Sequence, residues 1–168
     1  MTLTHEQLEA FTLTHESLVA QMTQQGLELD YSVESLKDVE ALCGGFRLLR
    51  EEEPDRAESV ARGFQTMAGA YVAEVFRRAV PGSELSWTDG ELVVMLPSRC
   101  EPKGRFKVVP GIRVGKLLRR QETLYWWATF FLAMAGYEPA VNPAPTGGAL
   151  PAVGPGHRVV ERISVVLE

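Results

Sequence analysis

A long helical pattern that changes abruptly into a strand pattern constrains this fold more than any other feature of the sequence. Apolar residues recur every three to four positions along one stretch, which puts them on one face of a helix; they are Phe64, Met67, Ala68, Tyr71, Val72, Val75 and Phe76. Pro54 suits a first helical turn, and Pro81-Gly82 ends a helix. The pattern predicts a helix over 54–80 whose apolar face lies in the core.

Immediately after this helix, apolar residues alternate with polar ones, as they do in a strand with one buried face. Two such runs flank Asp89-Gly90, a dipeptide typical of a two-residue hairpin turn, and their apolar positions are Leu85, Trp87, Leu92, Val94 and Leu96. A third short run, 106–109, precedes Pro110. We predict a β-hairpin followed by a third strand.

The helical spacing predicts four further helices, which cover 4–25, 32–43, 112–120 and 122–136. We expect Gly44-Gly45 to end the second of them, because each glycine costs a helix interior about 1 kcal/mol. The acidic run 51–53 then belongs to the start of the following helix, where the helix dipole favours negative charge. His15 lies on the apolar stripe of the first helix and is interpreted as an interface residue rather than a metal ligand.

The predicted helices precede and follow the strands instead of alternating with them, which indicates an α+β fold rather than a doubly wound α/β sheet. We expect one domain over 1–168, with N-terminal helices packed on a small, mostly antiparallel sheet and two further helices. Residues 139–156 hold five prolines, four glycines and no charged side chain, which predicts a long surface loop. Alternation over 158–167 predicts a last strand.

Composition and the start of the chain bear on the compartment. With 45% hydrophobic and 23% charged residues, the chain is neither disordered nor collagen-like. Its start lacks the basic and apolar regions of a signal peptide. The longest mostly apolar stretch, 124–136, has 13 residues, whereas a membrane-spanning helix needs about 20. Together with two cysteines outside any metal-binding spacing, these features predict a bacterial-type cytoplasmic protein without a membrane partner.

No pattern of catalytic or metal-binding residues stands out in the sequence. The His-Glu pairs at 5–6 and 15–16 lack the second histidine that a zinc-protease motif places four residues after the first. Glycine motifs for phosphate and the nucleophile-elbow motif are also absent. Cys100 lies beside Arg99, whose charge favours a thiolate, but a reactive thiol is the less favoured interpretation. We predict no catalytic residue, cofactor or metal, while a site assembled only by folding leaves an enzyme open.

Charge is unevenly distributed along the chain. Residues 1–60 carry a net charge of −9 and residues 61–120 carry +6, within a total of −5. Seven basic residues and no acidic one occur within 103–120; they are Lys103, Arg105, Lys107, Arg113, Lys116, Arg119 and Arg120. This segment is either an anion- or nucleic-acid-binding patch or a solvated surface that pairs with the acidic N-terminal third. We favour the second interpretation, because the chain is acidic overall and Phe106 is the only aromatic residue in the run.

A dense aromatic block lies in the last predicted helix, between Tyr125 and Phe131. Most of the apolar residues of this helix share one face, but Trp126 and Phe130 fall on a second face, one turn apart. Either the helix is buried on all sides, which we favour, or this second face meets a partner protein.

Two short motifs precede the predicted hairpin, one within 29–36 and the other within 69–78. Their defining residues are Asp30, Ser32, Ser35 and Leu36 in the first motif and Gly69, Tyr71, Ala73 and Glu74 in the second. Together with the Trp-bearing hairpin they resemble small bacterial α+β domains of unknown function, some of which look like immunity proteins of bacterial toxin systems. The resemblance covers about 27–97 and implies a fold rather than any catalytic residue.

The absence of a convergent catalytic set favours a binding protein over an enzyme. We predict a non-enzymatic cytoplasmic domain that binds another protein, in the manner of an immunity or adaptor protein. The alternative is an anion- or nucleic-acid-binding module that uses 103–120, with nucleic acid the less favoured partner; a homodimer is left open. The candidate binding residues are Lys103, Arg105, Lys107, Arg113, Trp126 and Phe130.

Overall fold

The part of the chain that the structure describes contains five helices and one three-stranded sheet, and their α+β order confirms the predicted fold class. The computed structural model describes residues 3–101, 103–119 and 123–138. Within these ranges the elements are α1 (His5–Gln24), α2 (Leu36–Glu52), α3 (Pro54–Ala79), β1 (Glu84–Thr88), β2 (Glu91–Pro97), β3 (Arg105–Val108), α4 (Pro110–Arg119) and α5 (Leu124–Met134). The predicted loop over 139–156 and the predicted strand over 158–167 lie outside the described residues.

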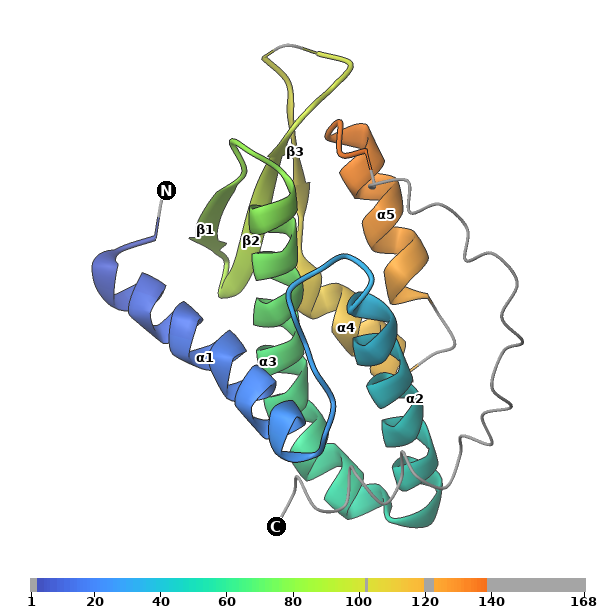
Figure 1. Ribbon diagram of the computed structural model, residues 1–168. Helices are drawn as coiled ribbons and strands as arrows, with labels where there is room; N and C mark the ends of the chain where they lie inside the picture. Colours follow the sequence, from blue (N-terminus) through green and yellow to red (C-terminus); the bar gives the residue numbers. More distant parts are fainter. Residues whose placement is uncertain (1–2, 102, 120–122, 139–168) are drawn as a thin grey trace, which may run out of the picture.

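Helix α3 runs through the middle of the fold and contacts α1, α2, α4 and the strands β1 and β2 (Figure 1). Six of its seven predicted apolar positions are buried, and Met67 is half-buried. Pro54 occupies the first turn, as predicted. Burial extends beyond the stripe to Gly69, Ala70 and Ala73, because elements pack on several sides of the helix. The apolar pattern therefore identified the core helix correctly.

The sheet has the order β1-β2-β3, and neighbouring strands are antiparallel. Asp89 and Gly90 join β1 to β2 with positive φ angles of 54° and 79°, as a type I′ turn requires. One face of the sheet packs into the core through Leu85, Val94, Leu96 and Val108. Helix α5 covers part of this face, where the ring centroids of Phe131 and Phe106 lie 5.8 Å apart. The predicted hairpin and third strand are both confirmed.

Helix α2 differs from the predicted second helix at both ends. It begins at Leu36 and continues through Gly44-Gly45 to Glu52, so the predicted break at these glycines is wrong. Each glycine costs the helix about 1 kcal/mol, but the turns beyond them bury Phe46 and Leu49, and each burial contributes about 1.5–3 kcal/mol. The first two residues of the acidic run consequently end α2 instead of starting α3.

Alanine in place of glycine is expected to have opposite effects at Gly44 and Gly69. At Gly44 the new methyl group would lie 3.6 Å from the Arg47 guanidinium, an ordinary contact, so Gly44→Ala should stabilise the protein by about 0.5–1 kcal/mol. At Gly69 it would lie 2.8 Å from the Gly111 Cα atom of α4, so Gly69→Ala should destabilise the protein by about 1–3 kcal/mol. Urea unfolding measures both changes, and a stability loss at Gly44 or a gain at Gly69 would contradict this packing.

Polar contacts fasten the 25–35 connection, which joins α1 to α2, against α3. The Tyr71 hydroxyl accepts a hydrogen bond from the Tyr31 backbone N–H at 2.9 Å and lies 2.6 Å from the Ser35 Oγ atom. His15 is buried, and its Nδ1 atom lies 2.8 Å from the Tyr31 hydroxyl oxygen. Burial lowers the pKa of His15 and raises the pKa of Tyr71. His15 is thus an interface residue of α1, as predicted.

Candidate functional site

The predicted basic segment is divided between two parts of the fold. Lys103 lies in the turn between β2 and β3, and Arg105 and Lys107 lie on β3; all three are exposed. Arg105 forms an ion pair with Glu84 of β1, with Nη1 and Oε2 2.7 Å apart. Among the described strands β3 lies at an edge of the sheet, and charged side chains on an edge strand discourage pairing with other chains. A structural role therefore accounts for Arg105 and Lys107, while Lys103 lies in the turn before the strand.

Arg113 lies apart from that strand, at the junction of α4 and α5. Its Nη2 atom donates a hydrogen bond to the Thr123 carbonyl at 2.8 Å. Its guanidinium also lies 5.6 Å from the ring centroid of Trp127 on α5. These contacts hold the start of α5 against α4, so Arg113 has a positioning role of its own.

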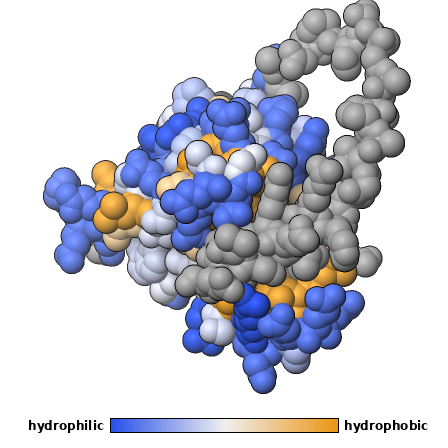
Figure 2. Space-filling model, turned by 60° about the horizontal axis from the view of Figure 1, so that its bottom comes forward, coloured by the Kyte–Doolittle hydropathy of each residue, from blue (hydrophilic) through white to orange (hydrophobic). Residues whose placement is uncertain are grey.

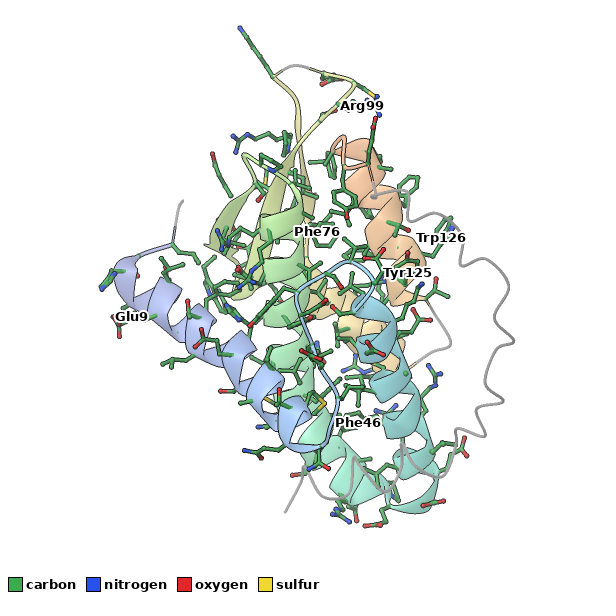
Figure 3. All side chains as sticks on the ribbon, in the orientation of Figure 1. Glu9, Phe46, Phe76, Arg99, Tyr125 and Trp126 are labelled. Carbon is green, nitrogen blue, oxygen red and sulfur yellow. The ribbon has the colours of Figure 1, made fainter. Side chains whose placement is uncertain are left out.

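Helix α5 presents an apolar stripe to the outside of the described structure. Trp126 is 67% exposed, Phe130 50% and Met134 39%, and they follow one another at four-residue intervals; we call these three residues the α5 stripe. The Trp126 and Phe130 rings are stacked, with centroids 6.0 Å apart and an interplanar angle of 17°. Figure 3 shows Trp126 on the outer side of α5. The favoured expectation that this helix is buried on all sides is wrong for these residues.

The packing of α5 explains why its second aromatic face is uncovered. Leu124, Ala128 and Leu132 are fully buried and form the face that meets the core. Among the described elements α5 packs mainly on α2 and α4, which cover it from one side. Helix α5 therefore covers the core with one apolar face and exposes its second apolar face.

The spacing along one helix distinguishes the α5 stripe from other exposed apolar residues. The large exposed apolar residues of the described structure are Leu8, Leu13, Leu48, Trp87, Ile112, Trp126, Phe130 and Met134. Figure 2 shows, on the face seen there, that hydrophobic residues gather in separate patches among hydrophilic ones. Only in α5 do three of the eight follow one another turn by turn, so that they form a continuous surface.

A shallow depression of about 450 Å³ adjoins Trp126 at the start of α5. The Lys37 ammonium lies 4.4 Å from the ring centroid of Tyr125 in this depression. Glu40 accepts hydrogen bonds from the backbone N–H groups of Leu124 at 2.8 Å and Tyr125 at 3.0 Å. Its carboxylate thereby caps the first turn of α5 and ties this helix to α2.

A larger cavity of about 580 Å³ lies between α1, α3 and the β1–β2 hairpin, and we call it the α1–α3 groove. Helix α1 crosses α3 obliquely, so its N-terminal half stands apart from α3 (Figure 1). The sequence does not mark this groove, because its walls come from separate elements that only the fold brings together. Trp87 carries the one local signal, as a large aromatic residue next to the hairpin turn.

The described residues hold one buried thiol and one exposed thiol, and their acidic and histidine side chains are scattered. No three His, Cys, Asp or Glu side chains in these ranges come together as a metal site requires. Cys43 is buried, and burial raises the pKa of its thiol to about 12, so the thiol is protonated at neutral pH. Cys100 is exposed. In the same ranges, no helix has both the length and the apolarity needed to cross a membrane.

Comparisons with known proteins add no relative from which a function follows. The chain matches no protein-family model, no curated protein and no solved structure. The resemblance of 27–97 to immunity-type domains stays a prediction, and function has to be inferred from the surfaces of the molecule itself.

Proposed function

We propose that this chain is a non-enzymatic binding domain of the bacterial cytoplasm, immunity- or adaptor-like, that holds another protein through the α5 stripe. The stacked and exposed pair of Trp126 and Phe130 carries this proposal. Large aromatic residues are enriched at the centre of protein interfaces, and a few of them supply most of the binding energy.

The rigidity of α5 supports the same function. Its buried face fixes the helix on the core, and the Glu40 carboxylate caps its first turn. A partner therefore meets side chains that are already ordered, and binding loses little conformational entropy. Burying the exposed parts of Trp126 and Phe130 would contribute about 1.5–3 kcal/mol for each ring.

The charges beside Trp126 favour an acidic partner. Lys37 and Arg47 line the adjoining depression, and Glu40, the acidic residue there, is engaged with the backbone of α5. Arg47 donates a hydrogen bond from Nη1 to the Leu117 carbonyl at 3.3 Å, and it still contributes its positive charge to this surface. A segment that carries an apolar side chain flanked by Asp or Glu complements both the aromatic rings and the two cations. We expect the apolar side chain of the partner to pack on Trp126 and its carboxylates to face Lys37 and Arg47.

Selection from a displayed peptide library tests this proposal. The wild-type domain serves for selection, and the Trp126→Ala/Phe130→Ala double variant serves for counter-selection. We expect selected peptides to share an apolar residue flanked by Asp or Glu, and the double variant to bind them at least about tenfold more weakly. Trp87→Ala is the matched control: it removes another half-exposed tryptophan from a different surface and should leave the affinity unchanged.

Two results would overturn the proposal for a different protein as partner. The first is that selection enriches no such peptides, or that the selected peptides bind the folded double variant as tightly as they bind the wild-type domain. The second is a homodimer, measured by light scattering, that dissociates in the double variant, since a second copy would then occupy the α5 stripe. Thermal melting establishes that each variant is folded before binding is compared.

A further inference from the structure

The α1–α3 groove has the dimensions and walls of a small-molecule site. Its volume of about 580 Å³ lies within the range of about 300–1,000 Å³ that ligand pockets occupy. Accessible aromatic surface comes from Trp87 of β1, which is 49% exposed, whereas Phe11 of α1 also lines the groove but is only 7% exposed. Residues with little or no side chain supply much of the remaining wall; they are Ala10, Gly69, Ala70, Gly90 and Gly111. Walls of this kind favour a flat ring, because the ring can stack on an aromatic face and approach the backbone closely.

Polar side chains in the groove offer both acceptor and donor atoms to a ligand. The Thr14 and Thr66 hydroxyls donate to carbonyl groups of their own helices, at 2.6 and 3.1 Å. Gln65 donates from Nε2 to the Gly111 carbonyl at 3.0 Å. The two hydroxyl oxygens and the Gln65 amide oxygen can accept hydrogen bonds from a ligand, while Gln65 Nε2 has a second N–H and the Gln7 amide can donate as well. A ligand with N–H or O–H groups on its edge suits this set of acceptors.

The two charged residues of the groove lie toward different ends of it. Glu91 is near the hairpin turn, and its Oε2 atom is 3.6 Å from the position that a Cβ atom on Gly111 would occupy. Gly111 in turn packs against Gly69 of α3. Arg62 precedes Gly69 by seven residues on the same helix, a rise of about 10 Å. The groove thus has a negative end at the hairpin and a positive end toward the start of α3.

Arg62 also lines a smaller cleft, of about 70 Å³, which we call the arginine cleft. Arg50 of α2 and Arg119 of α4 line it as well, and Glu58 is the acidic residue among its lining side chains. Glu58 lies 3.7 Å from Arg50, and no salt bridge within the described residues joins Arg62 or Arg119 to an acid. Arg50 also donates from Nη1 to the Leu118 carbonyl at 3.3 Å. Arg62 and Arg119 are therefore the guanidinium groups that make this cleft a favourable place for a phosphate.

We infer that the α1–α3 groove and the arginine cleft together bind a mononucleotide, with its base in the groove and its phosphate at Arg62. Arg62 and Gln65 line both cavities, which are therefore neighbours, and Arg62 can meet a phosphate at the end of the groove. Trp87 would stack on the planar base, and Arg62 with Arg119 would hold the phosphate. This site uses none of the residues of the α5 stripe, and the two can succeed or fail independently.

Glu91 determines which base is preferred. A carboxylate accepts hydrogen bonds from two neighbouring N–H donors, and the Watson–Crick edge of guanine presents such donors on its ring nitrogen and its amino group. The same edge of adenine offers one donor group beside an acceptor nitrogen, which the carboxylate oxygens repel. We expect the groove to bind GMP in preference to AMP.

Calorimetric titration of the full chain with GMP, AMP, guanosine, inorganic phosphate and a short single-stranded RNA tests this inference. We expect GMP to bind with a Kd of about 10–100 µM, and guanosine and phosphate each to bind at least about tenfold more weakly. Arg62→Ala and Trp87→Ala should each weaken GMP binding at least about tenfold, because they remove the phosphate partner and the stacking surface. Glu91→Gln should reduce the preference for GMP over AMP.

Matched controls separate this site from general charge and from the α5 stripe. Arg56→Ala removes an arginine from the same helix outside both cavities and should leave GMP binding unchanged. Trp126→Ala should also leave it unchanged. Arg62 and Trp87 are both exposed, so their variants are expected to fold, which thermal melting verifies.

Several outcomes would overturn the inference. The inference is wrong if neither GMP nor AMP binds at millimolar concentration. It is also wrong if the Arg62→Ala and Trp87→Ala variants bind GMP as tightly as the wild-type protein does. An RNA that binds where GMP does not would assign the groove to a nucleic-acid strand instead of a mononucleotide. Equal affinity of the wild type for GMP and AMP would overturn the guanine preference assigned to Glu91.

Discussion

Replacing Phe76 with alanine is expected to lower the free energy of unfolding by about 3–5 kcal/mol. Phe76 is fully buried near the end of α3, on the side of this helix that faces α5 (Figure 3). Its ring meets the Trp127 ring of α5 edge to face, with centroids 5.7 Å apart. Alanine would leave a cavity at the contact between the two helices, and the well-packed surroundings can collapse into it only in part.

Phe130→Ala is the matched control for this change. It removes the same side chain from the exposed face of α5, where Phe130 is half exposed. We expect a loss below about 1 kcal/mol, since little buried surface disappears. Urea unfolding at neutral pH measures both variants. Equal losses, or a larger loss for Phe130→Ala, would contradict the assignment of Phe76 to the core and of Phe130 to the surface.

Replacing Glu74 with glutamine is expected to lower stability by about 2 kcal/mol at neutral pH and to flatten its dependence on acid. The Glu74 side chain is 3% exposed. Its carboxylate accepts hydrogen bonds from Arg77 Nε at 2.6 Å, Arg77 Nη2 at 2.7 Å and Arg78 Nε at 2.7 Å. Both arginine side chains are about half exposed, which keeps the expected loss below that of a fully buried ion pair.

The pKa of Glu74 gives the sign of this pH dependence. Burial acts to raise the pKa, but the hydrogen bonds and charges of Arg77 and Arg78 outweigh it, so the pKa lies below the ordinary value of 4.5. The stabilisation is therefore fully present above about pH 4.5 and is lost as the pH falls through the folded-state pKa.

Denaturant unfolding of the wild-type protein and of Glu74→Gln, measured from pH 7 to pH 3, tests this pH dependence. The difference in stability between the two proteins should shrink on acidification. Glu9→Gln, at a side chain that is 66% exposed, is the control and should leave the wild-type profile almost unchanged. A difference between wild type and Glu74→Gln that stays constant from pH 7 to pH 3 would contradict the role given to the carboxylate.

Structural features that depend on contacts between near neighbours in the sequence could be predicted correctly. The stripe of α3 and the Asp89-Gly90 turn are both present as expected. A helical face or a two-residue turn is specified by neighbours within a few positions, so its pattern is visible in the chain itself. His15 was placed correctly for the same reason, since its position on an apolar stripe already indicates a helix interface.

The continuation of α2 through Gly44-Gly45 was not predictable from local propensity. The cost of glycine in a helix interior, about 1 kcal/mol, can be assigned from the sequence alone. The compensating burial of Phe46 depends on α3, where Phe64 lies 4.6 Å from it between ring centroids. Tertiary contacts of this size override a propensity of about 1 kcal/mol.

The fold class, the core helix and the hairpin follow from local patterns in the chain, because periodicity and turn chemistry act between near neighbours. Helical spacing also places Trp126 and Phe130 on a second face of α5, but the exposure of this face depends on which other elements cover it and became clear only from the packing. The same holds for the α1–α3 groove and the arginine cleft. Their walls come from residues as distant as Phe11 and Gly111, or Arg50 and Arg119, which no local pattern connects and only the packing of helices brings together.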